Sequence, residues 1–72
     1  MSTPIIDARG LACPEPVVLT QQAAKKYDAF TVLVDNRTAV QNITRFCGYQ
    51  KLSVLTTQEG SEFRMEIAAK GN

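Results

Sequence analysis

The sequence contains no histidine, and it has only two cysteines among its 72 residues. The absence of histidine excludes Ser-His and Cys-His nucleophilic catalysis, histidine general-base chemistry and the common zinc sites. Cys13 and Cys47 form no C-x-x-C pair, and without histidine they are too few for an ordinary structural zinc site. The four glycines are isolated, so no glycine-rich phosphate loop is present. We therefore expect a protein that uses neither a metal nor a cofactor.

The chain also lacks a charge excess and a long apolar run. Eight basic and seven acidic residues leave a net charge of +1, without any basic cluster. Nucleic-acid binding draws much of its affinity from neutralised phosphates, so this balance argues against direct binding. No stretch approaches the roughly 20 apolar residues of a membrane span, and the N-terminus lacks the charged and apolar regions of a signal peptide. We expect a cytoplasmic protein without membrane or direct nucleic-acid partners.

The apolar pattern divides the chain into six segments of secondary structure. Strands are expected where short apolar or alternating runs occur, at residues 5–7, 30–34, 52–57 and 63–67. The last two runs face each other across Glu59-Gly60-Ser61, as in a hairpin. One helix is expected from residue 14 to residue 26 or 27. A second helix is expected between a cap at Asp35-Asn36 and a C-terminal stop at Gly48.

This order, β-α-β-α-β-β, predicts an α/β (α+β) two-layer sandwich. A right-handed crossover would make the first two strands parallel and place both helices on one face of a mixed four-stranded sheet. Leu33 and Leu55 are then expected on the open face of the sheet. A chain of this length holds one domain, which we expect to span residues 1–72 and to be too small for a deep substrate cavity.

Apolar spacing assigns a buried face to each helix. On the first helix the expected buried residues are Pro16, Leu19, Ala23 and Tyr27, and the expected exposed residues are Val18, Gln22 and Lys25. On the second helix the apolar face holds Ala39, Val40, Ile43, Phe46 and Cys47. Cys47 is therefore expected in the core, where free cysteines are common. Cys13 starts one helix and Cys47 ends the next, so a separation of roughly 15–20 Å would prevent a disulfide.

The segment around Cys13 carries the chemical information in this sequence. Proline is favoured at the first helical position and biases the preceding residue away from helical geometry, so Cys13, before Pro14, is expected as the N-cap. There its sulfur would face the free amides and the positive end of the helix dipole, which favour the thiolate. Arg9 would add positive charge, whereas Glu15 opposes it. Because better capping residues exist, cysteine here favours function, although a purely structural role for Cys13 stays open.

The segment from Asp7 to Val17 resembles the signature of the TusA-like sulfur-carrier family, which includes SirA- and YedF-type proteins. The resemblance is carried by Asp7, by Gly10-Leu11 and by Cys13-Pro14-Glu15-Pro16, which matches the family's Cys-Pro-x-Pro motif. Residues 34–36 and 45–49 most resemble the N-terminal domain of YedF-type proteins, which often continue into a second, DsrE-like domain. The resemblance covers nearly the whole chain and implies the same β-α-β-α-β-β fold.

The resemblance implies a sulfurtransferase-type persulfide carrier, a relay protein rather than a stand-alone turnover enzyme. Cys13 would accept a persulfide from a cysteine desulfurase-like donor and relay it to an acceptor protein, in tRNA thiolation, cofactor sulfur or selenium-related metabolism. The residues expected to support Cys13 or to bind partners are Asp7, Arg9, Gly10, Leu11, Pro14, Glu15, Pro16, Val17 and Val18. Two alternatives stay open: a thiol redox or regulatory module, and a non-catalytic binding module with an RNA-binding-like fold.

Overall fold

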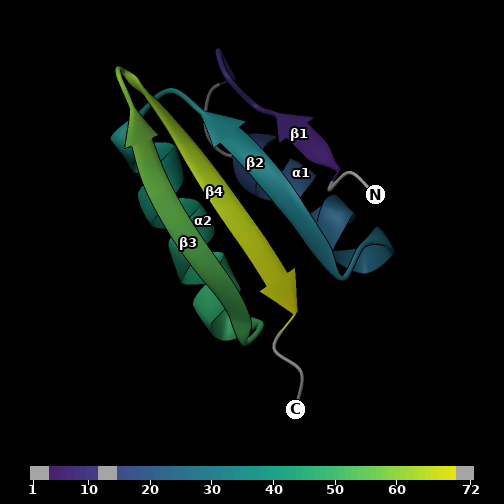
Figure 1. Cartoon of the computed structure of the whole chain (residues 1–72). Coiled ribbons are helices and arrows are strands. Elements are labelled where there is room, and N and C mark those ends of the chain that lie inside the picture. Colours follow the sequence, from purple (N-terminus) through teal and green to yellow (C-terminus); the bar gives the residue numbers. More distant parts are fainter. Residues whose placement is uncertain (1–3, 12–14, 70–72) are drawn as a thin grey trace.

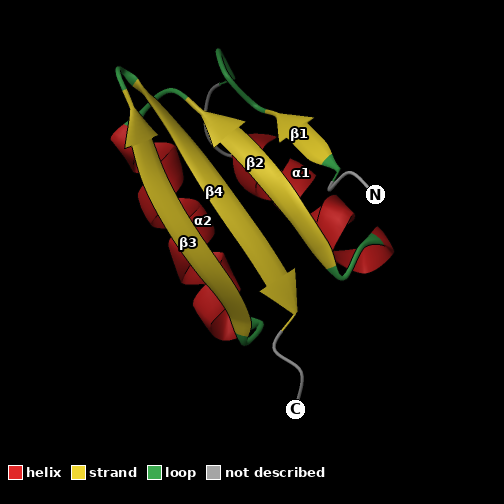
Figure 2. Cartoon of the chain, in the orientation of Figure 1, coloured by secondary structure: helices red, strands yellow, loops and turns green. Residues whose placement is uncertain are grey.

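The computed structural model describes residues 4–11 and 15–69. Its elements are β1 (Ile5–Asp7), α1 (Glu15–Lys26), β2 (Ala29–Val34), α2 (Arg37–Tyr49), β3 (Leu52–Glu59) and β4 (Glu62–Ala69). Both helices cover the same face of the sheet (Figures 1 and 2). The predicted element order and the two-layer sandwich are therefore confirmed. No helix in this part of the chain is both long enough and apolar enough to cross a membrane.

The described strands form one mixed sheet in the order β1-β2-β4-β3. The β1–β2 pair is parallel, as the crossover through α1 requires, and the other two pairs are antiparallel. The β3–β4 hairpin turns through Gly60-Ser61, and Glu59 pairs with Glu62. Gly60 has a φ of +65°, a left-handed conformation that two-residue hairpin turns need and glycine adopts freely. The central position of β2 and β4 leaves β1 and β3 as the edges.

The core lies between the helices and the central strands. Its fully buried or nearly fully buried apolar side chains include Phe30, Val32 and Val34 from β2, Met65 and Ile67 from β4, Ala23 from α1, and Ala39, Ile43 and Cys47 from α2. The expected apolar faces of both helices are thus largely confirmed, and so is the core position of Cys47. On the other face of the sheet, Leu33 is half-buried and Leu55 is 63% exposed, so the predicted open face is also present.

Two details of α1 depart from the expected pattern of burial. Tyr27, expected on the buried face, follows the last residue of the helix and is 42% exposed. Thr20 is fully buried although it is polar, because its hydroxyl donates a hydrogen bond to the carbonyl oxygen of Pro16 (2.8 Å). That bond satisfies the hydroxyl inside the helix and removes most of the cost of burial. Val18, Gln22 and Lys25 are exposed, as predicted.

The N-terminal cap of α2 is as predicted, whereas its C-terminal end is not. Asn36 is the N-cap, and its side-chain oxygen accepts the N–H of Ala39 (2.7 Å). Gly48 does not stop the helix, which continues to Tyr49. The left-handed residue after the helix is instead Lys51, with a φ of +58°, and its N–H donates to the carbonyl of Gly48 (3.3 Å). The bond closes the free end of the helix, as a C-terminal cap does.

The position of Cys47 generates a stability prediction. Its side chain is fully buried beside the core residue Ile43, and burial raises the pKa of its thiol to about 11. Cys47→Ala should lower the free energy of unfolding by about 1 kcal/mol, because a small buried side chain is lost. Urea denaturation followed by circular dichroism would measure the change. An equal or higher free energy of unfolding in the variant would contradict this assignment of Cys47 to the packed core.

Candidate functional site

The carboxyl ends of the two parallel strands meet at one edge of the sheet. We call this the carboxyl edge and define it as residues 7–11, 34–37 and 59–63. It contains the ends of β1 and β2, the start of α2 and the β3–β4 hairpin, and the first turn of α1 lies nearby (Figure 1). In open sheets with helical crossovers, functional groups gather at such an edge because loops and helix N-termini converge there. Most of the site residues predicted from the sequence lie at the carboxyl edge or on the first turn of α1.

Backbone hydrogen bonds fix the loop that follows β1. The N–H of Ala8, a fully buried residue, donates to the carbonyl of Leu33 (2.8 Å) and so continues the hydrogen bonding of β1 to β2. The N–H of Gly10 donates to Oδ2 of Asp35 (2.8 Å). Gly10 has a φ of +78°, a conformation that glycine adopts without strain. A further bond from the N–H of Leu11 to the carbonyl of Ala8 (3.4 Å) closes a turn. The loop is therefore attached to the end of β2.

Side-chain bonds attach the same loop to the hairpin. The Arg9 guanidinium holds Asp7 through two bonds, from Nε to Oδ1 (2.9 Å) and from Nη2 to Oδ2 (2.8 Å). Its Nη1 reaches Oε1 of Glu62 (3.2 Å) on β4. Exposed ion pairs add little stability one by one, but a bidentate pair fixes geometry. Arg9 thus joins the end of β1 to the start of β4.

This network also determines the charge state of the edge. Hydrogen bonds from Arg9 lower the pKa of Asp7 to about 2. The hydrogen bonds that Asp7 and Glu62 accept from the guanidinium raise the pKa of Arg9 above its ordinary value. Because two carboxylates share the guanidinium, its positive charge is offset within the network. The supply of positive charge to Cys13 that we expected of Arg9 is correspondingly weakened, and a role of Arg9 in holding the loop is favoured by its contacts.

The first turn of α1 presents both a buried and an exposed side. Glu15 is exposed, Pro16 is buried and Val17 is half-buried against the core. Val18 is 41% exposed, although it is apolar. Cys13 and Pro14 lie outside the described residues, so their predicted N-cap geometry is not tested. Of the described residues on either side of them, Leu11 belongs to the carboxyl edge and Glu15 begins α1.

Sequence reasoning missed two acidic residues that contact the predicted site residues. Asp35 was expected only as part of a helix cap, yet its Oδ2 receives the loop amide and its Oδ1 lies 3.3 Å from Nδ2 of Asn36. Its position directly after β2 was the available signal, because the ends of parallel strands meet at one edge. The sequence around Glu62 gave no indication of its contact with Arg9. That contact depends on the hairpin register, which places the start of β4 at the same edge.

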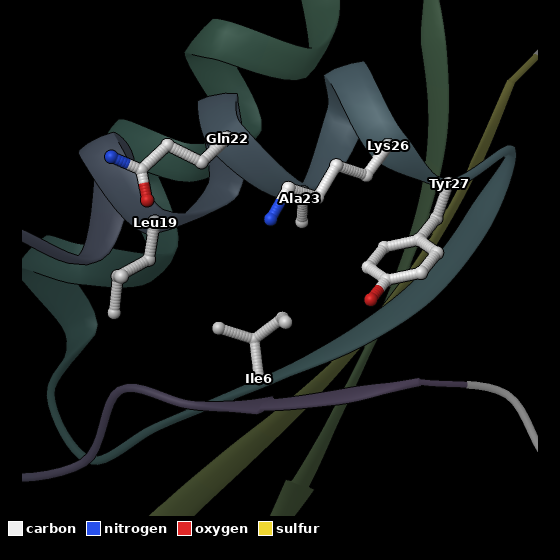
Figure 3. Close-up of a pocket in the computed structure, with 6 residues that line it drawn as sticks. All are labelled: Ile6, Leu19, Gln22, Ala23, Lys26 and Tyr27. Atoms are coloured by element: carbon white, nitrogen blue, oxygen red, sulfur yellow. The ribbon is translucent and has the colours of Figure 1, made fainter.

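A crevice elsewhere on the molecule is too small for a substrate chamber. It has a volume of about 140 Å³ and lies between β1 and the C-terminal half of α1, lined by Ile6, Leu19, Gln22, Ala23, Lys26 and Tyr27 (Figure 3). Typical small-molecule sites occupy about 300–1,000 Å³. Within residues 4–11 and 15–69, no group of three or more metal-binding side chains is present either. A second hollow, of about 320 Å³, lies on the open face of the sheet around Thr31, Arg64 and Glu66, outside the carboxyl edge.

Comparison with known proteins identifies the family. The sequence matches the family model described as Sulfurtransferase TusA over residues 5–69. The chain belongs to the TusA sulfurtransferase family. The TusA-family fold is also found in the crystal structure of a SirA-like protein from Desulfitobacterium hafniense. That structure has a TM-score of 0.87 and 26% sequence identity, and the match covers 96% of this chain and 100% of that chain. The family resemblance seen in the sequence is thus confirmed, while the closer likeness to YedF-type proteins stays a prediction.

The Asp7–Arg9 pair generates a pH-dependent prediction for this TusA-family domain. The pKa of Asp7 is lowered from 3.8 to about 2 in the folded state, so its contribution to stability is present above pH 4 and is lost as the pH falls toward 2. The free energy of unfolding should therefore fall more steeply over this range in the natural sequence than in Asp7→Asn. Urea denaturation at pH 5, 4, 3 and 2 would compare the two. Parallel pH profiles would contradict the depressed pKa.

Proposed function

We propose that this TusA-family chain is a persulfide carrier in which Cys13 receives a sulfur atom from a cysteine desulfurase-like donor and passes it to an acceptor protein. The observation that carries the proposal is the family match over residues 5–69, which includes Cys13 within the Cys-Pro-x-Pro sequence. The acceptor determines the final product, and the family resemblance implies tRNA thiolation, cofactor sulfur or selenium-related metabolism.

The proposed transfer needs no cofactor and no external oxidant. The Cys13 thiolate attacks the terminal sulfur of the donor persulfide. A sulfur–sulfur bond to Cys13 forms as the donor's bond breaks, and the donor cysteine leaves as a thiolate. An acceptor thiolate then attacks the terminal sulfur on Cys13 and releases the Cys13 thiolate. Each step exchanges one sulfur–sulfur bond for another, as in thiol–disulfide exchange. A preformed thiolate requires no general base, which suits a chain without histidine.

The two thiols of the chain would differ in reactivity for electrostatic reasons. The thiolate is the nucleophilic form of cysteine, and it is favoured at a helix N-terminus by the dipole and the free amides. Glu15 opposes this effect, but it is exposed, and its charge is screened by water and salt. Cys47 is the contrasting case, because burial raises its thiol pKa to about 11. Sulfur loading is therefore assigned to Cys13 and not to Cys47.

The surroundings of the loop support transfer between proteins. Bonds to Leu33 and Asp35 fix the loop on one side of residues 12–14. On the other side, Pro16 is buried, and its carbonyl accepts the hydroxyl of Thr20 one turn further along the same helix. A reactive group on such a rigid support is well placed for direct transfer, because positioning lowers the entropic cost of reaction. A sulfur at the surface would be open to a partner cysteine.

Sulfur loading gives the decisive test of this proposal. The protein would be incubated with a cysteine desulfurase and cysteine, and its mass would then be measured without reductant. We expect the addition of one sulfur atom to the natural sequence and to Cys47→Ala, and none to Cys13→Ala. Circular dichroism would verify that both variants fold. Sulfur on Cys47, or only sulfenic acid and disulfide products on Cys13, would overturn the carrier proposal and would favour a thiol redox module.

The exposed side of α1 is proposed to contact the partner proteins, together with Leu11 and Val17. Val18 is apolar and 41% exposed on the first turns of the helix, where the core gains little from it. Val18→Asp should slow sulfur transfer to the acceptor about tenfold, as expected when a charge enters an apolar contact, and should leave the fold intact. Gln41→Asp adds the same charge at an exposed position on the other helix, α2, and is the matched control. Equal transfer rates for the two variants would place the contact elsewhere.

A further inference from the structure

The edge strand β3 lacks the features that usually protect an edge strand. It pairs with β4 on one side and ends the sheet on the other. From Leu52 to Gln58 it contains neither a charged residue nor a proline, and its pairing with β4 runs without a bulge. Exposed edges commonly carry charges, prolines or bulges that prevent pairing with another chain. The opposite edge strand, β1, is only three residues long. β3 is therefore the edge at which a further strand can pair.

The hydrogen-bond pattern shows which residues of β3 direct their backbone groups outward. The N–H of Ala69 donates to the carbonyl of Asp28 (2.7 Å), on the side of β2. The backbone N–H and C=O of Ala69 thus point away from β3. Ala69 and its register partner on β3, Leu52, therefore form a non-hydrogen-bonded pair. The backbone groups of Leu52 consequently face outward. Because these directions alternate along an antiparallel strand, Val54, Thr56 and Gln58 also present a free N–H and C=O at the edge.

A second copy of the same strand fits this pattern when it pairs antiparallel about a two-fold axis at Leu55. In that register Val54 lies opposite Thr56 of the second copy, and Leu52 lies opposite Gln58. Outward-facing residues then meet one another and exchange both of their hydrogen bonds. Leu55, which is 63% exposed on the open face, meets its own copy at the axis. Such an apolar cross-strand pair stabilises a sheet.

Charge complementarity selects this register and this occupant. The same two-fold brings Lys51, the left-handed residue just before β3, close to Glu59 at the last position of the strand in the second copy. The pair occurs twice, once at each end of the contact. Opposite charges at facing positions are favourable, whereas like charges are destabilising. We propose that β3 is a self-association edge, at which two copies of this chain join their four-stranded sheets into one.

The surroundings of β3 allow this contact. Thr56 and Gln58 point toward the helix side, as their register partners Met65 and Phe63 do, yet both are exposed. Helix α2 therefore does not cover these two side chains, although it packs behind the same strand (Figure 1). Because the two strands run in opposite directions, the carboxyl edges of the two copies lie at opposite ends of the joined sheet. Both loops that lead to Cys13 would stay accessible, so the association is compatible with sulfur transfer.

The oligomeric state as a function of concentration tests the proposal. Sedimentation equilibrium on the natural chain should show a reversible monomer–dimer equilibrium. Lys51→Glu and Glu59→Lys should each raise the dimer dissociation constant about tenfold, because each places like charges at both ends of the contact. The double variant should restore the natural value, since it exchanges the two charges. Restoration would establish the register as well as the interface.

Two further variants test the contact at the β3 edge without disturbing the fold of the domain. Leu55→Lys places like charges at the two-fold axis and should yield a monomer, and the exposure of Leu55 protects the fold. Thr56→Pro removes an outward N–H but no bond to β4, so it should also yield a folded monomer. Circular dichroism would verify folding in both. The proposal would be overturned if the natural chain stayed monomeric at every concentration, or if none of these variants weakened the dimer. Pairing of β3 with an extended segment of another protein would not rescue it.

Discussion

The attachment of the β1 loop to the end of β2 is the constraint on which the proposed site depends. β1 has only three residues, and Ile5 is 55% exposed, so its own burial holds it weakly. Hydrogen bonds at both ends supply the rest: Thr31 donates to the carbonyl of Pro4, Ala8 donates to Leu33, and Gly10 donates to the Asp35 carboxylate. The last of these is charge-assisted and about twice as strong as a neutral bond. The loop is thus fixed to β2, a central strand whose residues are mostly buried.

The charged groups of the carboxyl edge serve this attachment more than they serve the reacting sulfur. Arg9 is shared by Asp7 and Glu62, and Arg37 lies over the ring of Phe63, 5.8 Å from its centroid. These contacts hold the hairpin and the start of α2 against the loop. The carboxyl edge as a whole is net negative, because it holds four acidic residues and only two basic ones. Stabilisation of the proposed anionic sulfur would therefore come mainly from the helix dipole and the free amides of α1. An environment of this kind can favour both the thiolate and the persulfide anion.

The elements of the fold could be predicted because their signals are local. Alternation identified the hairpin strands, and the spacing of Ala39, Ile43 and Cys47 identified the buried face of α2. The errors lie at the helix ends. Gly48 is a good terminator, yet α2 continues to Tyr49 and the left-handed residue that follows is Lys51, while Tyr27 lies just beyond the last turn of α1. Asp35 and Glu62 were missed because their partners lie 25 and 53 residues away. Only the sheet order brings such residues together, and no periodicity in the sequence encodes it.

The size of the domain explains why its chemistry is proposed for an edge and not for a cavity. A chain of this length buries about 60% of its potential surface, and its two layers are filled by the core residues between them. The crevice beside Ile6 holds only about 140 Å³. A larger hollow of about 320 Å³ lies on the open face of the sheet, around Thr31, Arg64 and Glu66, so neither lies at the carboxyl edge where the chemistry is proposed. Enclosure must then come from a partner protein, which would cover the reacting sulfur during transfer and exclude water from it. A small carrier therefore needs a rigid loop more than a pocket, because its partner can complete the site only if the loop keeps one position.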